Sequence, residues 1–116
     1  MEIAFDKKSL RQICEHDEKA KGDLGVKVAE KLKRRLADLR AAITVKDLVA
    51  GRPGELDGPR HRHIGVDLCE GYRIVFCANH NSIPMLKSDR VDWSKVSRVK
   101  ILRIESHHGQ TRDFSA

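Results

Sequence analysis

Apolar side chains recur at a spacing close to 3.6 over residues 24–43, and Leu10, Ile13 and Cys14 fall on one side of an earlier segment, which predicts helices. A short apolar segment at 2–5 can pair as an edge strand, and Asp6 can then cap a first helix that starts KKSLRQICEHDEKA. Gly22 and Asp23 interrupt the pattern, and a second helix is expected over 24–43. Its apolar stripe consists of Val28, Leu32, Leu36, Leu39 and Ile43. The N-terminal half is therefore expected to contain two amphipathic helices.

A segment rich in glycine and proline follows the helices. Thr44 is a suitable N-cap for a further turn, VKDLVA, which ends at Gly51. Residues 51–59 contain three glycines and two prolines, so a loop is expected there. This loop is too short to separate two domains, and residues 1–116 are predicted to form a single domain.

From His61 onward the apolar residues alternate with other residues, and this period of two predicts β-strands. The alternating apolar positions are Ile64, Val66 and Leu68 in one run and Tyr72, Ile74 and Phe76 in the next. With a tight connection at 69–71, the two runs are expected to form an antiparallel hairpin. Residues 78–97 have no clear period, and VKILRIES at 99–106 supplies a third strand.

The parity of these strands separates two faces of the expected sheet, because side chains two residues apart lie on the same face. If the apolar positions of the hairpin, together with Leu102 and Ile104, face the helices, the opposite face is polar. Its residues are His61, His63, Asp67, Arg73, Arg103, Glu105 and His107. The sequence therefore predicts an α+β fold, with two N-terminal helices packed on one face of a small, mainly antiparallel sheet and a cationic surface that contains histidines on the other.

Composition favours a polyanionic partner. The chain has 23 Lys and Arg against 17 Asp and Glu, a formal charge of +6 and a pI near 9.5. An anionic membrane surface or an acidic protein would suit the same charge. Three cysteines without CxxC spacing argue against a disulfide framework or a closed zinc site, so we expect the reducing cytoplasm. Neither a signal sequence nor an apolar run long enough to span a membrane is evident.

Arg73 is the leading candidate for a chemical role, because it lies in the middle of the apolar strand GYRIVF. A guanidinium can bind an anionic phosphate bidentately, and imidazoles can move protons near neutral pH. The end of the third strand, RIESHH, supplies His107 and His108 as acid or base, with His63 and Glu105 in reserve. These residues predict a small basic ribonuclease that needs no cofactor or metal. The ordinary alternative is that Arg73 is solvated or pairs with Glu105.

Two further groups of residues have ordinary and functional interpretations. His61 and His63 form an HxH pair that could bind zinc with Cys77 or His80, but a fourth ligand is not evident, and interleaved arginines fit contacts with phosphate or RNA better. The second helix has a basic face, which is usually just solvated surface but could also bind RNA. That face consists of Lys27, Lys31, Arg34, Arg35 and Arg40.

The order and spacing of these elements resemble the HigB branch of the RelE/ParE toxin superfamily. LDG at 56–58 precedes GYRIVF, Tyr72 lies fourteen residues after Gly58, and the last strand ends at His107 and His108. These features are similar to that branch's Leu-Lys-Gly turn, its aromatic-Arg-Ile strand and its terminal Tyr-His. The resemblance covers about residues 1–108, apart from a longer stretch between Cys77 and Arg98.

The resemblance implies a microbial-ribonuclease-type fold and an mRNA interferase, which cuts messages in the A site of the 30S ribosomal subunit. It also implies a helix-turn-helix, HigA-like antitoxin as partner. By the same resemblance, Arg73 would contact the scissile phosphate, and His108 would be the catalytic histidine. Strand parity instead places His107 on the open face beside Arg73, so the choice of imidazole stays open.

The chain departs from the family pattern at the turn and at the last strand. Asp57 replaces the turn lysine, Ser106 replaces an aspartate, and His107 replaces the tyrosine. Asp57 cannot donate to a phosphate, so cations that follow the turn could substitute for the lysine. The candidates are Arg60, His61 and Arg62, and without such a substitute the activity would be weakened. Together with His63, these residues form the expected RNA- or phosphate-binding group.

Two alternatives to the ribonuclease are a gyrase-inhibiting toxin of the ParE type and a basic RNA-binding module without activity. The ParE branch does not use the terminal histidine, so His107 and His108 argue against it.

Overall fold

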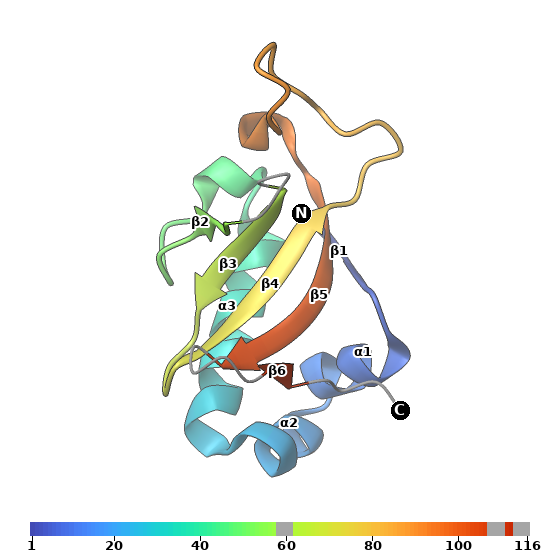
Figure 1. Ribbon diagram of the computed structural model, residues 1–116. Helices are drawn as coiled ribbons and strands as arrows, with labels where there is room; N and C mark the ends of the chain where they lie inside the picture. Colours follow the sequence, from blue (N-terminus) through green and yellow to red (C-terminus); the bar gives the residue numbers. More distant parts are fainter. Residues whose placement is uncertain (58–61, 107–110, 113–116) are drawn as a thin grey trace.

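A strand and three consecutive helices open the chain, and most of the remaining elements are strands (Figure 1). The computed structural model describes residues 1–57, 62–106 and 111–112. The helices are α1 (Lys8–Glu15), α2 (Asp17–Leu24) and α3 (Val26–Ala41), with 3-10 turns η1 (Val45–Asp47) and η2 (Trp93–Lys95). The strands are β1 (Glu2–Phe5), β2 (Gly54–Glu55), β3 (His63–Asp67), β4 (Tyr72–Ala78), β5 (Arg98–Ser106) and β6 (Thr111–Arg112).

The described strands form one sheet in the order β1-β5-β4-β3-β2, and β6 also pairs with β5. Only the pairing of β1 with β5 is parallel; the other described pairings are antiparallel. Since β4 pairs along nearly all of β5, strands β1 and β6 share the opposite edge of β5. The expected edge strand, the hairpin of β3 and β4, and the third strand are confirmed.

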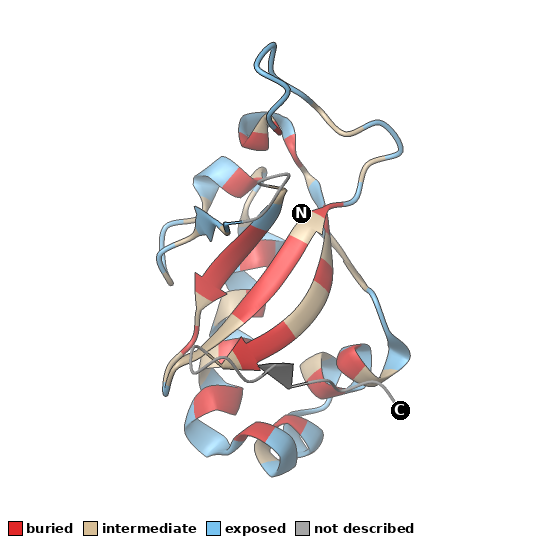
Figure 2. Cartoon of the chain, viewed as in Figure 1, coloured by how far each residue is buried: buried red, intermediate tan, exposed pale blue. Residues whose placement is uncertain are grey.

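The core lies between the helices and one face of the sheet. Helix α3 passes behind β3 and β4, whereas α1 and α2 lie at the end of the sheet where β5 finishes (Figure 1). The inward residues of the central strands are buried, as the red bands of Figure 2 show. The main core residues are Leu10, Ile13, Val28, Leu32, Leu36, Leu39, Ile64, Val66, Ile74, Phe76, Ile101 and Ile104. None of the described helices covers the opposite face of the sheet (Figure 1), and this open face carries Arg73 and Arg103 as the parity of the strands predicted, although Gly65 and Val75 on it are buried.

The helices differ from the sequence-based prediction in four details. Gly22 and Asp23 do not interrupt the pattern but lie within α2, and the break falls at Gly25 (φ +87°) between α2 and α3. The first helix is divided at His16, whose backbone is extended (φ −121°, ψ 108°), so three α-helices are described where two were expected. Asp6 does not cap α1, because Lys7 occupies the N-cap position. Ile43 lies beyond the end of α3 and is 79% exposed, so it does not extend the apolar stripe. Thr44 does occupy the N-cap position of the next turn, where the Asp47 carboxylate accepts from the Thr44 N–H (2.9 Å).

Two strand details were also not foreseen. Strand β2 lies within the predicted loop at 51–59 and pairs with β3. A β-bulge shifts the register between β4 and β5, so that Val75 pairs with Arg103 but Phe76 pairs with Ile101. Leu102 is the extra residue, and it is half-buried while Ile101 enters the core. The expectation that Leu102 faces the helices is therefore wrong, although Arg103 and Glu105 keep their predicted face.

Residues 79–97 form an excursion between β4 and β5 that projects beyond the sheet (Figure 1). Met85 and Val91 pair across it, and the Leu86 N–H donates to the Arg90 carbonyl at its tip (2.7 Å). Its base is part of the core, because Val91, Trp93 and Val96 are buried. None of the described helices is long and apolar enough to cross a membrane.

Candidate active site

Three charged residues lie side by side on the open face of the sheet. Asp67 of β3 pairs in register with Arg73 of β4, and Arg73 pairs with Glu105 of β5. Residues directly opposite one another on neighbouring antiparallel strands have side chains on the same face. The short turn at 69–71 and the hairpin register therefore bring two carboxylates to the two sides of Arg73.

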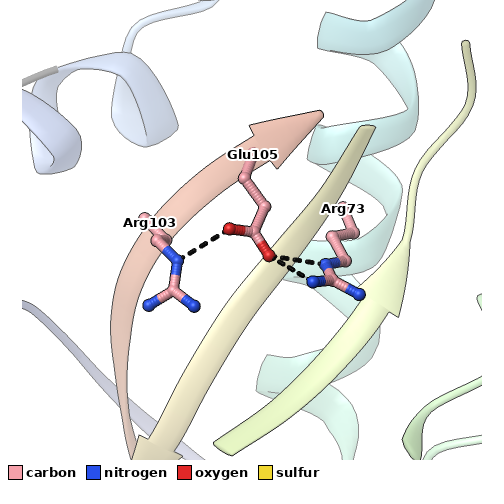
Figure 3. Close-up of polar contacts among 3 residues, drawn as sticks. All are labelled: Arg73, Arg103 and Glu105. Atoms are coloured by element: carbon pink, nitrogen blue, oxygen red, sulfur yellow. Dashed lines mark hydrogen bonds and ion pairs between the residues drawn. The ribbon is translucent and has the colours of Figure 1, made fainter. Parts of the chain in front are cut away.

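Arg73 and Arg103 both bind the carboxylate of Glu105 (Figure 3). Arg73 donates from Nε to Glu105 Oε1 (2.6 Å), and its Nη2 is 2.5 Å from the same oxygen. Arg103 donates from Nε to the other oxygen, Oε2 (2.9 Å). The ordinary role anticipated for Arg73, pairing with Glu105, is thus present, and Arg103 is a third member of the cluster.

Glu105 is the most buried member of this cluster. The residue is 8% exposed, whereas the Arg73 and Arg103 side chains are 31% and 35% exposed. Burial by itself would raise the pKa of the Glu105 carboxyl, but the hydrogen bonds from Arg103 and Arg73 and the charges of both guanidiniums lower it overall. Glu105 is therefore ionised at neutral pH, and its carboxylate, which is more buried than either guanidinium, binds both arginines.

A second ion pair lies on the other side of Arg73. Arg52, which precedes β2, donates from Nε to Asp67 Oδ2 (2.7 Å), and its Nη2 is 2.5 Å from that oxygen. Glu55 of β2 likewise accepts from Nη2 of Arg90 at the tip of the excursion (2.8 Å). Much of the positive charge on this face is thus neutralised within the protein.

Two hollows lie on the open face and share Arg73. The first, of about 310 Å³, is lined by Glu55, Leu56, Asp57, His63, Arg73 and Arg103. The second, of about 330 Å³, is lined by Arg52, Gly54, Glu55, Leu56, Gly65, Asp67 and Arg73. The side chain of Leu56 packs against Gly65 of β3, because a Cβ atom built on Gly65 would lie 2.8 Å from Leu56 Cδ2. Leu56 therefore lies against β3 and lines both hollows.

His63 is the described histidine that lies in the same hollow as Arg73 and Arg103. Although His63 is an exposed residue, its pKa is lowered, first because its surroundings partly desolvate the imidazolium and second because of the Arg103 charge. An imidazole held neutral near pH 7 can accept a proton or a hydrogen bond. The hollow therefore combines two guanidiniums with one basic ring nitrogen.

The other predicted site residues are not all gathered here. Arg60, His61, His107 and His108 lie outside the described residues. Arg62 is half-buried just before β3. On α3, which covers the other face of the sheet, Arg34 is exposed and Lys31 is half-buried. The described structure therefore does not join the α3 cations to the Arg73 cluster.

Arg35 departs from the expected exposed basic face. Its side chain is 15% exposed and donates from Nη1 to Asp38 Oδ2 (2.9 Å). Its Nε lies 3.0 Å from the position of a Cβ built on Gly51, so the arginine packs against the loop that follows η1. The helical period could not reveal this loop contact.

The alternative of a zinc site gains no support from His80. Its Nε2 accepts hydrogen bonds from the backbone N–H groups of Ser97 (3.0 Å) and Arg98 (3.3 Å), which connect the start of the excursion to the start of β5. Among the residues that the structure describes, no three His, Cys, Asp or Glu side chains are grouped to hold a metal ion.

Sequence reasoning gave no role to Arg103, Arg52 or Arg90. Strand parity placed Arg103 on the open face two residues before Glu105, and this was the available signal. Arg52 pairs with Asp67, 15 positions away in the chain, and Arg90 pairs with Glu55, 35 positions away, so only the fold reveals these ion pairs.

Comparison with known proteins gives a likeness of fold alone. No family model matches the chain, and no curated protein matches it. Among solved structures, it is similar to the YoeB dimer from Staphylococcus aureus, with a TM-score of 0.53 and 14% identity over 88% of this chain and 91% of that chain. The fold is RelE-like. The α+β fold class expected from the sequence is therefore confirmed.

Proposed function

We propose that this protein is the toxin of a type II toxin-antitoxin system, of the HigB-like kind, and cleaves mRNA on the ribosome. Its fold supports this proposal, because YoeB is a toxin of the RelE superfamily. The observation that carries the proposal is the hollow on the open face, where Arg73, Arg103 and His63 lie together. Guanidiniums suited to a phosphate and an imidazole suited to proton transfer are the groups that RNA cleavage needs.

The proposed reaction is cleavage at a phosphodiester without a metal ion. A base removes the proton of the ribose 2′-hydroxyl, and the 2′-oxygen forms a bond to phosphorus while the bond to the 5′-oxygen breaks. An acid gives a proton to the departing 5′-oxygen. Arg73 would stabilise the negative charge on the phosphorane, and His107 or His108 would serve as acid or base, with His63 as a further base.

The remaining cations would contribute binding rather than chemistry. Arg60, His61 and Arg62 would contact the RNA backbone in place of the lysine that Asp57 replaces, and Asp57 itself lines the hollow. His63 would add a backbone contact beside its role as a base. The α3 residues Lys31, Arg34 and Arg35 would steer the protein to ribosomal RNA, with Arg35 limited by its burial. The partners would be mRNA in the 30S A site and a HigA-like antitoxin, in the cytoplasm.

Expression without the antitoxin tests this function. We expect growth arrest and truncation of translated messages, and both should be relieved by Arg73→Ala and by His108→Ala, because each removes a group needed in the transition state. Primer extension on translated mRNAs measures the cleavage. Lys19→Ala on α2 is the matched control, since Lys19 is an exposed cation in a surface ion pair, and this variant should remain toxic.

Two outcomes would contradict the proposal. If Arg73→Ala and His108→Ala stayed fully toxic while DNA supercoiling changed, the protein would be a gyrase-inhibiting toxin instead. If expression neither arrested growth nor cut any message, a basic RNA-binding module would fit better.

A further inference from the structure

The Glu105 carboxylate lies between the Arg73 and Arg103 guanidiniums (Figure 3), and each guanidinium has N–H groups that make no hydrogen bond among the described residues. Arg73 uses Nε and Nη2 for Glu105 Oε1, and Arg103 uses only Nε for Oε2. Nη1 of Arg73 and both Nη atoms of Arg103 have no hydrogen-bond partner in the part of the chain that the structure describes, and Figure 3 shows those of Arg103 turned away from Glu105. Both arginines line the same hollow.

We propose that Glu105 is a positioning residue that holds Arg73 and Arg103 on either side of its carboxylate, so that one phosphodiester group in the hollow binds to both. This inference rests on the proposed function, because it identifies how that site would bind its substrate. Without a carboxylate between them, two long cationic side chains would repel each other and adopt many rotamers. Glu105 removes this repulsion and fixes both guanidinium planes before a ligand arrives.

The charges of the hollow favour a phosphodiester over a phosphate monoester. Two arginines and one ionised carboxylate leave a single positive charge in the cluster, which matches the single negative charge of a diester. Glu55, which is already paired with Arg90, and Asp57 line the same hollow, and Asp57 offsets the remaining positive charge. A dianionic monoester would therefore be repelled more strongly than a monoanionic diester, which the directed hydrogen bonds of the two guanidiniums would hold. The site is therefore suited to the backbone of a nucleic-acid strand rather than to a terminal phosphate.

Glu105→Gln tests the positioning role through the sign of its effect on binding. Simple electrostatics predicts that loss of a negative charge strengthens binding of an anion. The positioning role predicts the opposite, because the glutamine amide can accept from Arg73 but presents an NH₂ group to Arg103. With a single-stranded oligonucleotide of 2′-O-methyl riboses, which cannot be cleaved, we expect binding about tenfold weaker, the effect of losing about one charge-assisted hydrogen bond.

Glu2→Gln is the matched control, because it removes a carboxylate that is paired with an arginine, Arg98, but lies on β1 and lines neither hollow. It should bind the oligonucleotide no more weakly than the parent protein. Fluorescence anisotropy on the full chain gives the dissociation constants. Should Glu105→Gln fail to fold, Arg103→Lys keeps the charge but cannot contact Glu105 and a phosphate with one planar group, and it should also weaken binding about tenfold.

Equal or tighter binding by Glu105→Gln, or parental binding by Arg103→Lys, would overturn the proposal. A parent protein with no Arg73-dependent oligonucleotide binding would also overturn it. Failure of the broader function looks different: binding that depends on Glu105 and Arg103, without cleavage of translated mRNA, would leave this site intact and remove the ribonuclease. Conversely, cleavage unaffected by these substitutions would remove only the positioning role.

Discussion

At the scale of single residues, the open face is a set of mutual ion pairs rather than a row of free cations. Parity along the strands predicted that Arg73, Arg103 and Glu105 share a face, because this depends only on local strand geometry. It could not predict that one carboxylate serves both arginines, since this depends on register between β4 and β5 and on side-chain rotamers. The decisive feature, Glu105 beneath two half-exposed guanidiniums, is therefore visible only in the folded chain.

The pKa of His63 provides a prediction at this scale. Burial and the Arg103 charge place it below the ordinary value, so the unfolded chain binds more protons between the folded pKa and about 6.5. The stability that His63 contributes is present above this window and is lost as the pH falls through it. Arg103→Gln should raise the pKa only in part, because burial is the larger cause.

An NMR titration of the His63 ring signals measures this pKa. Arg34→Gln, which removes an exposed cation on the other side of the sheet, should leave the value unchanged. A parent value at or above the ordinary range would contradict the environment described for the hollow. An unchanged value in Arg103→Gln would show that Arg103 does not act on the imidazole.

At the scale of elements, the sequence predicted best those segments in which apolar residues recur at a regular spacing. Helix α3 and the hairpin of β3 and β4 follow local apolar spacing, so their core residues were correctly identified. The bulge at Leu102 and the short strand β2 depend on pairing with a neighbouring strand. No local pattern marks such positions, because the energy that selects them comes from the partner strand and from packing.

The loop that follows η1 is constrained in conformation and in space at Gly51. The φ of Gly51 is +86°, and an added Cβ would lie 2.6 Å from Val66 Cγ1 and 2.8 Å from the Asp67 carbonyl oxygen. Gly51→Ala combines backbone strain with a clash against the backbone of β3, so we expect the free energy of unfolding to fall by about 2 kcal/mol or more.

Urea denaturation of Gly51→Ala and Gly22→Ala makes the comparison. Gly22 lies within α2, and an added Cβ would meet no atom within 4 Å. Gly22→Ala should therefore raise the free energy of unfolding by about 0.5–1 kcal/mol. Equal effects of the two substitutions would mean that the loop at Gly51 is not packed between Arg35 and β3 as described.

At the scale of the whole molecule, the excursion at 79–97 is joined to the rest of the chain at both its base and its tip. The Val45 N–H donates to the Val96 carbonyl (3.1 Å), which connects the turn after α3 to the end of the excursion. Arg90 reaches Glu55 of β2 at the edge of both hollows. Although its sequence has no period, the segment is not expected to unfold separately from the sheet.

Trp93 tests this unity, because it is the only tryptophan in the sequence and is buried at the base of the excursion. We expect its fluorescence and the far-UV circular dichroism of the whole chain to change at the same urea concentration, as in a two-state transition.

Val96→Ala should move both curves to lower urea together, with a free energy of unfolding reduced by about 2 kcal/mol, since the fully buried valine packs within the shared core. Leu86→Ser, at a position 48% exposed at the tip, should shift neither curve. A tryptophan transition at lower urea than the circular dichroism transition would instead mean that the excursion is an independent unit, and the ion pair between Arg90 and Glu55 would then contribute little to the shape of the hollows.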